Sequence, residues 1–287
     1  MKSLRNKVAA VTGAGSGIGR ALALQLANEG CHLALADIDN QGLDDTCELL
    51  AHQPVTVTRQ TLNVADEAAV FAWAEQVVVD HGQVNLIINN AGVALSGTVD
   101  GLSLDDYRWI MDVNFWGVMY GSKAFLPKLQ ASGDGHIVNI SSVFGLASQP
   151  LMSGYNASKF AVRGFTESLR QDLELTGSCV SATSVHPGGI KTNIAKAARM
   201  DHSCERATGV SNAAATADFE RMFINTPEKA ARTIIAGIVK NKRRVLIGPD
   251  ARVFDWLVRL LPSAYQRLFT AAVRHQSRAQ TNRATQA

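Results

Sequence analysis

Short apolar runs alternate with amphipathic stretches along most of the chain. Seven runs, many rich in β-branched residues, predict strands. Most of them are apolar on both faces, which is typical of a parallel sheet that helices cover on both sides. The stretches between the runs have helical spacing. The predicted strands are 7–12, 32–36, 55–60, 85–90, 136–141, 180–185 and 244–248, and the predicted helices are 18–29, 40–51, 66–80, 104–130, 153–175 and 227–240.

This alternation predicts an α/β fold: a single-domain, Rossmann-type, doubly wound parallel sheet of about seven strands with helices on both faces. We expect that domain to span residues 1–250. Two segments depart from the alternation. Residues 191–225 are polar and alanine-rich, and we expect a substrate loop there, because long excursions in compact domains are often lids. Residues 251–287 form an amphipathic C-terminal extension, which Pro262 divides into two predicted helices.

Composition narrows the function classes. Hydrophobic residues make up 46% of the 287 and charged residues 18%, as in an ordinary globular protein. A net charge of +3 and a single short basic run at 240–244 give no basic face for nucleic acid. The four cysteines and seven histidines show no metal-ligand spacing, so we expect no metal and reduced thiols. No uncharged apolar run reaches the ~18–20 residues of a membrane span. We therefore expect a cytoplasmic protein.

A glycine-rich loop, TGAGSGIG at 12–19, directly follows the first predicted strand and opens a helix. Gly13 permits a tight turn, and Gly17 and Gly19 let backbone and helix approach closely. The helix N-terminus then offers free N–H groups to a pyrophosphate. In this context of strand, turn and helix, the pattern predicts a dinucleotide site.

The second predicted strand ends at Asp37, 18 residues after Gly19. A carboxylate at about that distance accepts hydrogen bonds from the adenosine ribose hydroxyls, and it would repel a 2′-phosphate. Ile38 follows where an arginine could hold that phosphate, and Ser16 in the glycine loop is not basic. These residues favour NAD over NADP.

Tyr155 and Lys159 stand four residues apart, so they share one face of a helix. An ammonium about 4–5 Å from a phenol, at an effective dielectric near 20, would favour the phenolate by roughly 3–4 kcal/mol. That corresponds to a pKa lower by on the order of 2–3 units, which suits a general acid/base. Ser142, NNAG at 89–92 and HPGGIKT at 186–192 follow three predicted strands, at the sheet edge where such folds bind ligands.

Taken together, TGAGSGIG, NNAG, Asn114 in MDVNFWG, NISS, YNASK and PGGIKT resemble the short-chain dehydrogenase/reductase family over residues 5–250. The resemblance implies that Tyr155 is the acid/base and that Lys159 lowers its pKa and binds the nicotinamide ribose. It implies that Ser142 polarises the substrate carbonyl and that Asn114 positions a proton-relaying water. The implied cofactor residues, besides Tyr155 and Lys159, are Gly13, Ser16, Gly17, Ile18, Gly19, Asp37, Ile38, Asn63, Val64, Asn90, Ala91, Gly92, Pro187, Gly188, Ile190 and Thr192. Asn63 stands where the family usually has an aspartate, so its amide oxygen would meet the adenine amino group.

The extension has an apolar face that must be covered. We expect it to pack on the substrate loop or a neighbouring subunit, with a lipid surface as the alternative. The substrate is therefore expected to be bulky and apolar. Family resemblance further implies a homodimer or homotetramer. The residues expected to contact the substrate are Ala94, Ser142, Val143, Phe144, Leu151 and Ile194.

The sequence therefore predicts an NAD-dependent oxidoreductase that interconverts a hydrophobic secondary alcohol and its ketone. One alternative is an NADPH-dependent carbonyl or 3-oxoacyl reductase. Another is a catalytically silent, dinucleotide-sensing scaffold. The complete set of Asn114, Ser142, Tyr155 and Lys159 argues against a scaffold, because binding alone does not need all four.

Overall fold

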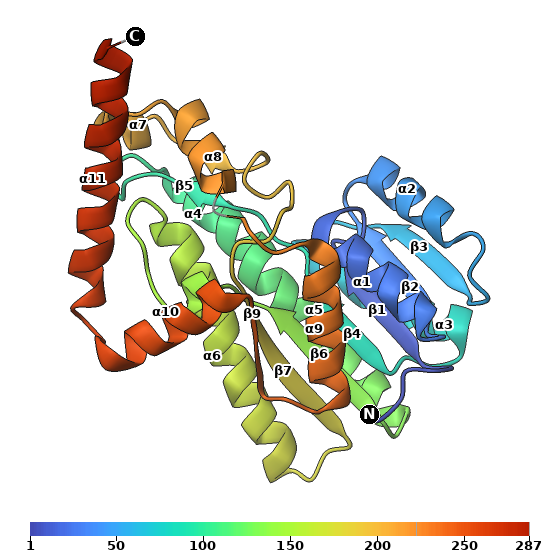
Figure 1. The fold of residues 1–287 in the computed structure, drawn as a ribbon. Helices are drawn as coiled ribbons and strands as arrows, with labels where there is room; N and C mark the ends of the chain where they lie inside the picture. The colour runs from blue at the N-terminus through green and yellow to red at the C-terminus, as the bar shows by residue number, and fades with distance from the viewer. Residues whose placement is uncertain (222, 287) are drawn as a thin grey trace.

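A seven-stranded parallel sheet forms the centre of the molecule (Figure 1), as seen in a computed structural model that describes residues 1–221 and 223–286. The strand order β3-β2-β1-β4-β6-β7-β9 reverses direction beside β1, as in a doubly wound sheet. The predicted fold class is confirmed. The strands are β1 (Val8–Thr12), β2 (His32–Asp37), β3 (Val57–Thr61), β4 (Leu86–Asn89), β6 (Gly135–Ile140), β7 (Val180–Pro187) and β9 (Arg244–Ile247).

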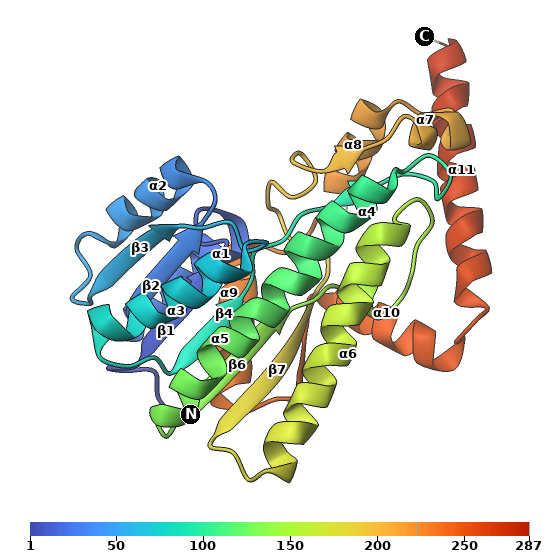
Figure 2. The same ribbon diagram turned by 180° about the vertical axis from the view of Figure 1, so that it is seen from behind.

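Three helices cover each face of the sheet (Figures 1 and 2). Side chains alternate between the faces along each strand: Ala9 and Val11 of β1 join one core cluster, and Val8 and Ala10 join the other. Both clusters are apolar, which explains why the strands read as continuous apolar runs. One face carries α1 (Gly17–Asn28), α2 (Asn40–Leu50) and α9 (Pro227–Val239), and the other carries α3 (Glu67–His81), α5 (Gly117–Ala131) and α6 (Ser153–Leu175).

The predicted helix 104–130 is not continuous. It consists of α4 (Leu104–Met111), a π-helical turn η1 (Asp112–Trp116) and α5. Such single π turns interrupt α-helices most often at functional sites. Here the turn holds Asn114, whose side chain is fully buried and bonds to Val93 in the loop that follows β4. Hydrophobic periodicity cannot reveal one extra residue in a turn, so the sequence pattern missed it.

Residues 191–225 contain regular structure that the sequence pattern did not predict. A two-residue strand β8 (Arg199–Met200) pairs with β5 (Leu95–Ser96), and α7 (Ser203–Thr208) and α8 (Asn212–Arg221) follow it. Together these elements lie beyond the carboxyl ends of the sheet strands, near α4 (Figure 1). A short 3-10 turn, η2 (Val143–Gly145), follows β6.

The C-terminal extension forms two helices, α10 (Pro249–Leu260) and α11 (Tyr265–Gln286). Pro262 lies in the break between them, where the sequence placed it. Helix α10 packs against β9 and η2, while α11 runs along the outside of the molecule toward α7 (Figures 1 and 2). Within the described part of the chain, no helix has both the length and the apolar character needed to cross a membrane.

Candidate active site

The glycine loop has a left-handed backbone at two positions, φ 66° at Gly13 and φ 52° at Gly17. A Cβ on Gly19 would overlap the Gly13 carbonyl, so the helix can approach the turn this closely only with glycine there. Asn90 fixes the loop from β4: its Nδ2 donates to the carbonyls of Thr12 at 2.9 Å and Gly13 at 3.2 Å. The loop is thus a rigid turn at the N-terminus of α1, which suits a pyrophosphate.

Asp37 lies beside this loop at the end of β2. Its Oδ2 accepts from the Gly15 N–H at 2.8 Å and its Oδ1 from the Asp39 N–H at 3.0 Å. Ile38, 68% exposed, follows it at the surface. Arg20 donates to the carbonyls of Gly15 and Gly42 and pairs with Asp45 at 3.5 Å, so its guanidinium is engaged by groups other than Asp37. The carboxylate is in the place expected for a ribose ligand.

The other adenosine-side residues lie at the ends of β3 and β4. Asn63 is exposed, and its Oδ1 accepts from the Ala65 N–H at 3.1 Å within its own turn. Val64 is buried against Gly117 at the start of α5. The N–H groups of Asn90 and Ala91 both donate to Thr12 Oγ1, at 3.0 and 3.1 Å. Thr12, which the sequence analysis did not single out, therefore ties β4 to the glycine loop.

Tyr155 and Ser142 are buried together at the carboxyl ends of β6 and β7. Burial raises the pKa of the Tyr155 phenol, and a hydrogen bond with the Ser142 side chain lowers it. Ser142 caps the η2 turn, where its Oγ accepts from the Phe144 N–H at 3.1 Å. The serine hydroxyl is thereby held at the tyrosine, as a carbonyl-polarising group would be.

Lys159 lies one helical turn after Tyr155 on α6. Its Nζ donates to the Ile140 carbonyl at 3.1 Å and lies 5.8 Å from the Tyr155 ring centroid. Burial lowers the pKa of the Lys159 ammonium to about 8. Burial of the phenol opposes the lowering of its pKa that we expected from Lys159. That role of Lys159 stays a prediction.

Asn114 and Lys159 both border Gly92. A Cβ on Gly92 would lie 3.1 Å from Asn114 Oδ1 and 3.3 Å from Lys159 Nζ. The Asn114 amide accepts from the Val93 N–H at 2.8 Å and donates to the Val93 carbonyl at 3.0 Å and Ser158 Oγ at 3.1 Å. The structure therefore brings the four predicted catalytic residues to one crevice.

The end of β7 and the loop after it carry four of the predicted cofactor residues. Pro187 ends the strand, the Gly188 N–H donates to the Ile247 carbonyl at 3.0 Å, and Ile190 bridges to Asn225. The Thr192 methyl group lies 3.0 Å from the position of a Cβ on Gly17. Thr192 thus faces the glycine loop, and its role at the cofactor stays a prediction. The remaining loop residue, Ile18, is half-buried in the first turn of α1 after Ser16, which is exposed.

Asp250, in the first turn of α10, is a site residue that the sequence analysis missed. Its Oδ2 accepts from the Gly189 N–H at 2.6 Å, and Asn225 Nδ2 lies 3.4 Å from its Oδ1. A Cβ on Gly188 would overlap the carboxylate, so glycine is required there. The aspartate is 61 residues away in sequence, and only the fold brings it to the loop.

His186 supports Ser142 from β7. Its Nδ1 lies 2.9 Å from the Ser142 carbonyl and its Nε2 lies 3.0 Å from Ser184 Oγ. Burial lowers the pKa of His186 to about 4, so the ring is neutral at pH 7. A neutral ring that donates from Nδ1 accepts from the Ser184 hydroxyl at Nε2. His186 therefore supports the position of Ser142 as an uncharged ring.

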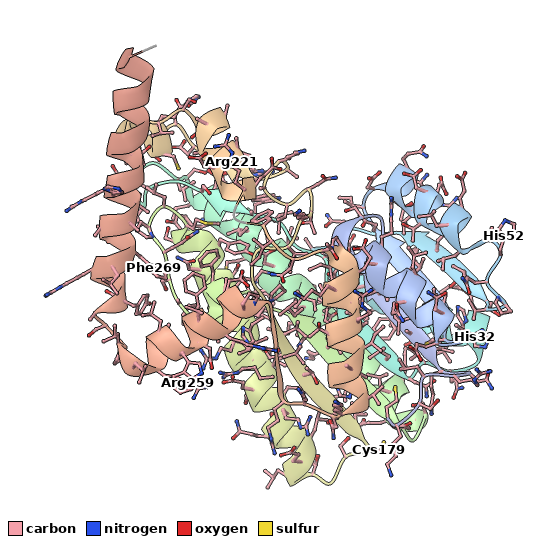
Figure 3. All side chains as sticks on the ribbon, viewed as in Figure 1. His32, His52, Cys179, Arg221, Arg259 and Phe269 are labelled. Carbon is pink, nitrogen blue, oxygen red and sulfur yellow. The ribbon has the colours of Figure 1, made fainter. Side chains whose placement is uncertain are left out.

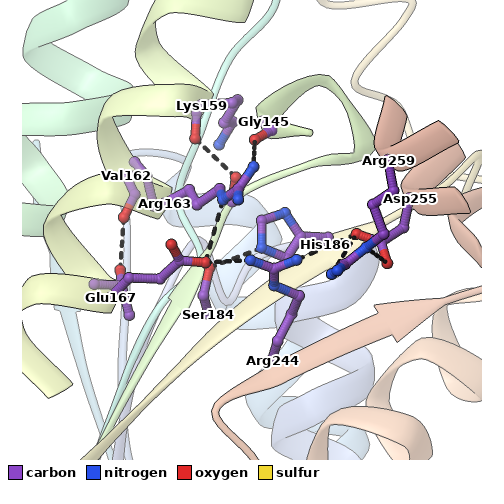
Figure 4. A network of polar contacts seen from close by, with 12 residues as sticks. Gly145, Lys159, Val162, Arg163, Glu167, Ser184, His186, Arg244, Asp255 and Arg259 are labelled. Atoms are coloured by element: carbon purple, nitrogen blue, oxygen red, sulfur yellow. Dashed lines mark hydrogen bonds and ion pairs between the residues drawn. The ribbon is translucent and has the colours of Figure 1, made fainter. Parts of the chain in front are cut away.

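Beside His186, a chain of ion pairs joins α6 to β9 and α10 (Figure 4). Glu167 on α6 pairs with Arg163 at 3.2 Å and with Arg244 of β9. Arg244 also pairs with Asp255 of α10 at 3.2 Å, and Asp255 pairs with Arg259 at 2.9 Å. The helix that carries Tyr155 and the extension are therefore fastened to each other.

An apolar cluster surrounds Tyr155. Ala94, Val143, Phe144 and Ile194, predicted to contact the substrate, all belong to it. Leu151 does not: it takes φ 65°, its carbonyl accepts from the Gly97 N–H at 2.7 Å, and it lines a separate open groove of about 530 Å³. Sequence alone could not show the left-handed backbone that places it there.

Aromatic rings continue this cluster into the extension. The Phe144 ring centroid lies 6.4 Å from those of Tyr155 and of Phe254 on α10. Phe254 in turn lies 5.4 Å from Phe269, on the side of α11 that faces the rest of the molecule (Figure 3). Tyr265 stacks edge-on against Phe269 and accepts at its hydroxyl from the Ser148 N–H at 3.1 Å. Helix α10 thus forms one side of the apolar region next to Tyr155.

No metal centre competes with this interpretation in the described part of the chain, where no three histidine, cysteine or acidic residues gather as metal ligands would. What the geometry offers is a cradle for a dinucleotide, a buried tyrosine with a serine and a lysine beside it, and apolar walls. This arrangement suits hydride transfer between a nicotinamide and a carbonyl compound.

Comparison with known proteins agrees with this geometry. The family model described as short chain dehydrogenase matches residues 7–203. The putative oxidoreductase SadH of Mycobacterium tuberculosis is 48% identical over 275 residues, which are 95% of this chain and 97% of SadH. The probable oxidoreductase EphD of the same species is 34% identical over 88% of this chain and 43% of EphD.

Among solved structures, a short-chain dehydrogenase/reductase from Burkholderia phymatum in complex with NAD superposes with a TM-score of 0.83. It shares 32% identity, over 93% of this chain and 97% of that one. The chain belongs to the short-chain dehydrogenase/reductase family and is an oxidoreductase of that family. The NAD complex supports a nicotinamide dinucleotide as its cofactor.

Proposed function

We propose that the protein interconverts a bulky, apolar secondary alcohol and its ketone with NAD(H). The observation that carries the proposal is the buried Tyr155, which lies with Ser142 and Lys159 inside a cluster of apolar side chains. A buried phenol beside a serine hydroxyl can hold a carbonyl oxygen and exchange a proton with it. The apolar surroundings favour a substrate that has little polar surface.

Each residue has a defined part in the proposed reaction. The bound dinucleotide supplies a hydride to the carbonyl carbon in reduction and accepts it in oxidation. Ser142 donates a hydrogen bond to the carbonyl oxygen, and Tyr155 transfers its proton to that oxygen as the alcohol forms. Lys159 returns a proton toward Tyr155 from the side of Asn114, since both border Gly92. In oxidation the same protons move in reverse.

The preference for NAD rests on Asp37. Its carboxylate accepts from the Gly15 N–H inside the ribose side of the loop, and a 2′-phosphate there would meet a like charge. Ile38 offers no charge to bind that phosphate. The alternative, an NADPH-dependent carbonyl or 3-oxoacyl reductase, would need Arg20 to release the Gly15 and Gly42 carbonyls.

We also assign catalysis to residues 1–250 acting together with the rest of α10 in the 251–287 extension, because Phe254 of that helix packs against Phe144. Trp116 and Phe160 expose apolar surface on η1 and α6, which supports a homodimer or homotetramer formed through these helices. The four cysteines are free, in keeping with a reducing cytoplasm.

A cofactor and substrate panel tests the proposal. Turnover is followed by NADH and NADPH absorbance with ketones of increasing size and with the matching secondary alcohols. We expect kcat/KM with NADH to exceed that with NADPH at least about tenfold, as one repelled phosphate charge costs more than ~1.4 kcal/mol. A preference for NADPH would overturn the reading of Asp37. Cofactor binding without turnover of any substrate would favour the sensing scaffold.

A further inference from the structure

An apolar stripe lies on the outer surface of α10. Val253, Trp256 and Leu260 are three and four residues apart, so they share one helix face. Their exposed fractions are 63%, 66% and 67%. Leu261, in the break after α10, and Leu268, on α11, are also exposed, at 39% and 53%. We call these five residues the outer stripe. Contiguous exposed apolar side chains of this size mark an interaction surface.

The outer stripe is not needed for packing, because the opposite face of α10 makes the contacts with the body of the protein. Ala251 is fully buried, Phe254 meets Phe144, and Asp255 pairs with Arg244. Asp250 holds the Gly189 N–H. The helix therefore has a rigid inner face at the active site and an apolar face turned outward.

The charge around the outer stripe is positive. The segment 250–275 has four arginines and two aspartates, Asp250 and Asp255. Asp250 accepts from the Gly189 N–H, and Asp255 pairs with Arg244 on the inner side and with Arg259 at 2.9 Å. Arg252 and Arg259, seven residues apart, share the flank next to Trp256, and both are exposed. Arg267 is exposed on α11. A tryptophan and leucines bordered by arginines complement the headgroups and acyl boundary of an anionic bilayer.

We propose that the outer stripe docks on an anionic lipid bilayer. Its apolar side chains enter the acyl boundary, and Arg252, Arg259 and Arg267 meet the lipid phosphates. Docking is peripheral, since no described helix could span the bilayer. Arginine suits this role because its guanidinium binds phosphate oxygens in a fork.

The inner face of α10 links the docking surface to the substrate class. This inference rests on the proposed function. Phe254, on the inner face of α10, packs against Phe144, and Phe144 in turn packs against Tyr155. A bilayer on the outer stripe therefore lies one helix away from the reacting tyrosine. The substrate class that fits is an alcohol or ketone that partitions into lipid.

Co-sedimentation of the full-length protein with vesicles tests the docking. We use phosphatidylcholine vesicles and vesicles of phosphatidylcholine mixed with phosphatidylglycerol, at low and high salt. We expect binding to the anionic vesicles that weakens with salt, as screened charges require. Trp256→Gln and Leu260→Gln should each reduce that binding about tenfold, the equivalent of one large apolar side chain left in water.

Leu175→Gln is the matched control, because Leu175 is 87% exposed at the end of α6 and should leave vesicle binding unchanged. Equal vesicle binding by the wild type and the Trp256→Gln/Leu260→Gln double variant would overturn the proposal. So would a double variant that forms a smaller oligomer in light scattering, since a second copy would then cover the outer stripe. Failure to bind any vesicle overturns it as well.

The two proposals fail separately. Vesicle binding needs no turnover, and the double variant should keep wild-type kcat on a water-soluble ketone. If the wild type turns over ketones but does not bind vesicles, only the lipid-docking proposal is contradicted. If the wild type binds vesicles but turns over no substrate, the proposed reaction is contradicted and the docking proposal stands.

Discussion

Burial acts on Tyr155 and Lys159 in opposite directions. It raises the pKa of the phenol and lowers that of the ammonium to about 8. A tyrosine in this position needs a nearby positive charge to become a base at ordinary pH. Lys159 is the charge that the helix supplies, and its effect on the phenol can be measured.

Lys159→Ala should shift the pH profile of alcohol oxidation upward. If the ammonium stabilises the phenolate, its removal moves the half-maximal kcat to higher pH by on the order of 2–3 units. The measurement is kcat for oxidation between pH 6 and 11 at saturating cofactor. Lys128→Ala, which removes the α5 lysine that pairs with Glu75 of α3, is the control. An unshifted profile in Lys159→Ala would show that Lys159 does not tune Tyr155.

His186 should make the free energy of unfolding decrease at acidic pH. Its pKa is lowered to about 4 in the fold, below the unfolded value of 6.5, so the unfolded state binds the proton first. The stability due to the neutral ring is complete above pH 6.5 and is lost as pH falls through 4, by about 3 kcal/mol. Urea unfolding of His186→Gln should show a shallower loss between pH 6.5 and 4 than wild type. The exposed His202→Gln should not differ from wild type.

At the scale of elements, α10 connects the extension to the cofactor loop and the apolar cluster. Asp250 binds the Gly189 N–H, Phe254 packs on Phe144, and Asp255 pairs with Arg244. These three residues are spaced so that one helix face makes all the contacts. The extension is therefore a wall of the site in this structure.

Asp250→Ala should weaken cofactor binding through the loop. Loss of a charge-assisted hydrogen bond costs about 1.5–3 kcal/mol, so we expect KM for NADH to rise roughly tenfold or more. The turnover number should change less, because Asp250 does not touch the reacting groups. Asp250→Asn keeps an acceptor oxygen and should restore part of the affinity. An unchanged KM in both variants would show that the loop holds its shape without α10.

Phe254→Ala should change the preference of the enzyme for substrates of different size. Removing the ring opens the wall beside Phe144 and costs stability, about 2 kcal/mol for a half-buried ring. We expect kcat/KM to fall most for bulky apolar ketones and little for small ones, measured on the same panel. Trp256→Ala, on the outer face of the same helix, is the control. Equal losses on small and bulky substrates would argue that the wall does not contact the substrate.

At the scale of the whole molecule, the sheet could be predicted because its signals are local. Apolar β-branched runs, the glycine loop and Tyr155 with Lys159 are each visible within a few residues. What could not be predicted depends on distant contacts. The π turn at Asn114 is set by its bonds to Val93, and Asp250 reaches Gly189 only in the folded chain. Leu151 lies outside the apolar cluster with a left-handed backbone, and that conformation has no sequence signal.

The central claim is that Tyr155 transfers the proton while the cofactor transfers the hydride. Paired assays of wild type and Tyr155→Phe test it most directly, since the variant keeps the ring and loses only the hydroxyl. We expect NADH binding to be retained, by fluorescence titration, and kcat to fall by about 10²–10⁴-fold, the usual contribution of a general acid/base. Equal turnover by the variant and the wild type would contradict the account.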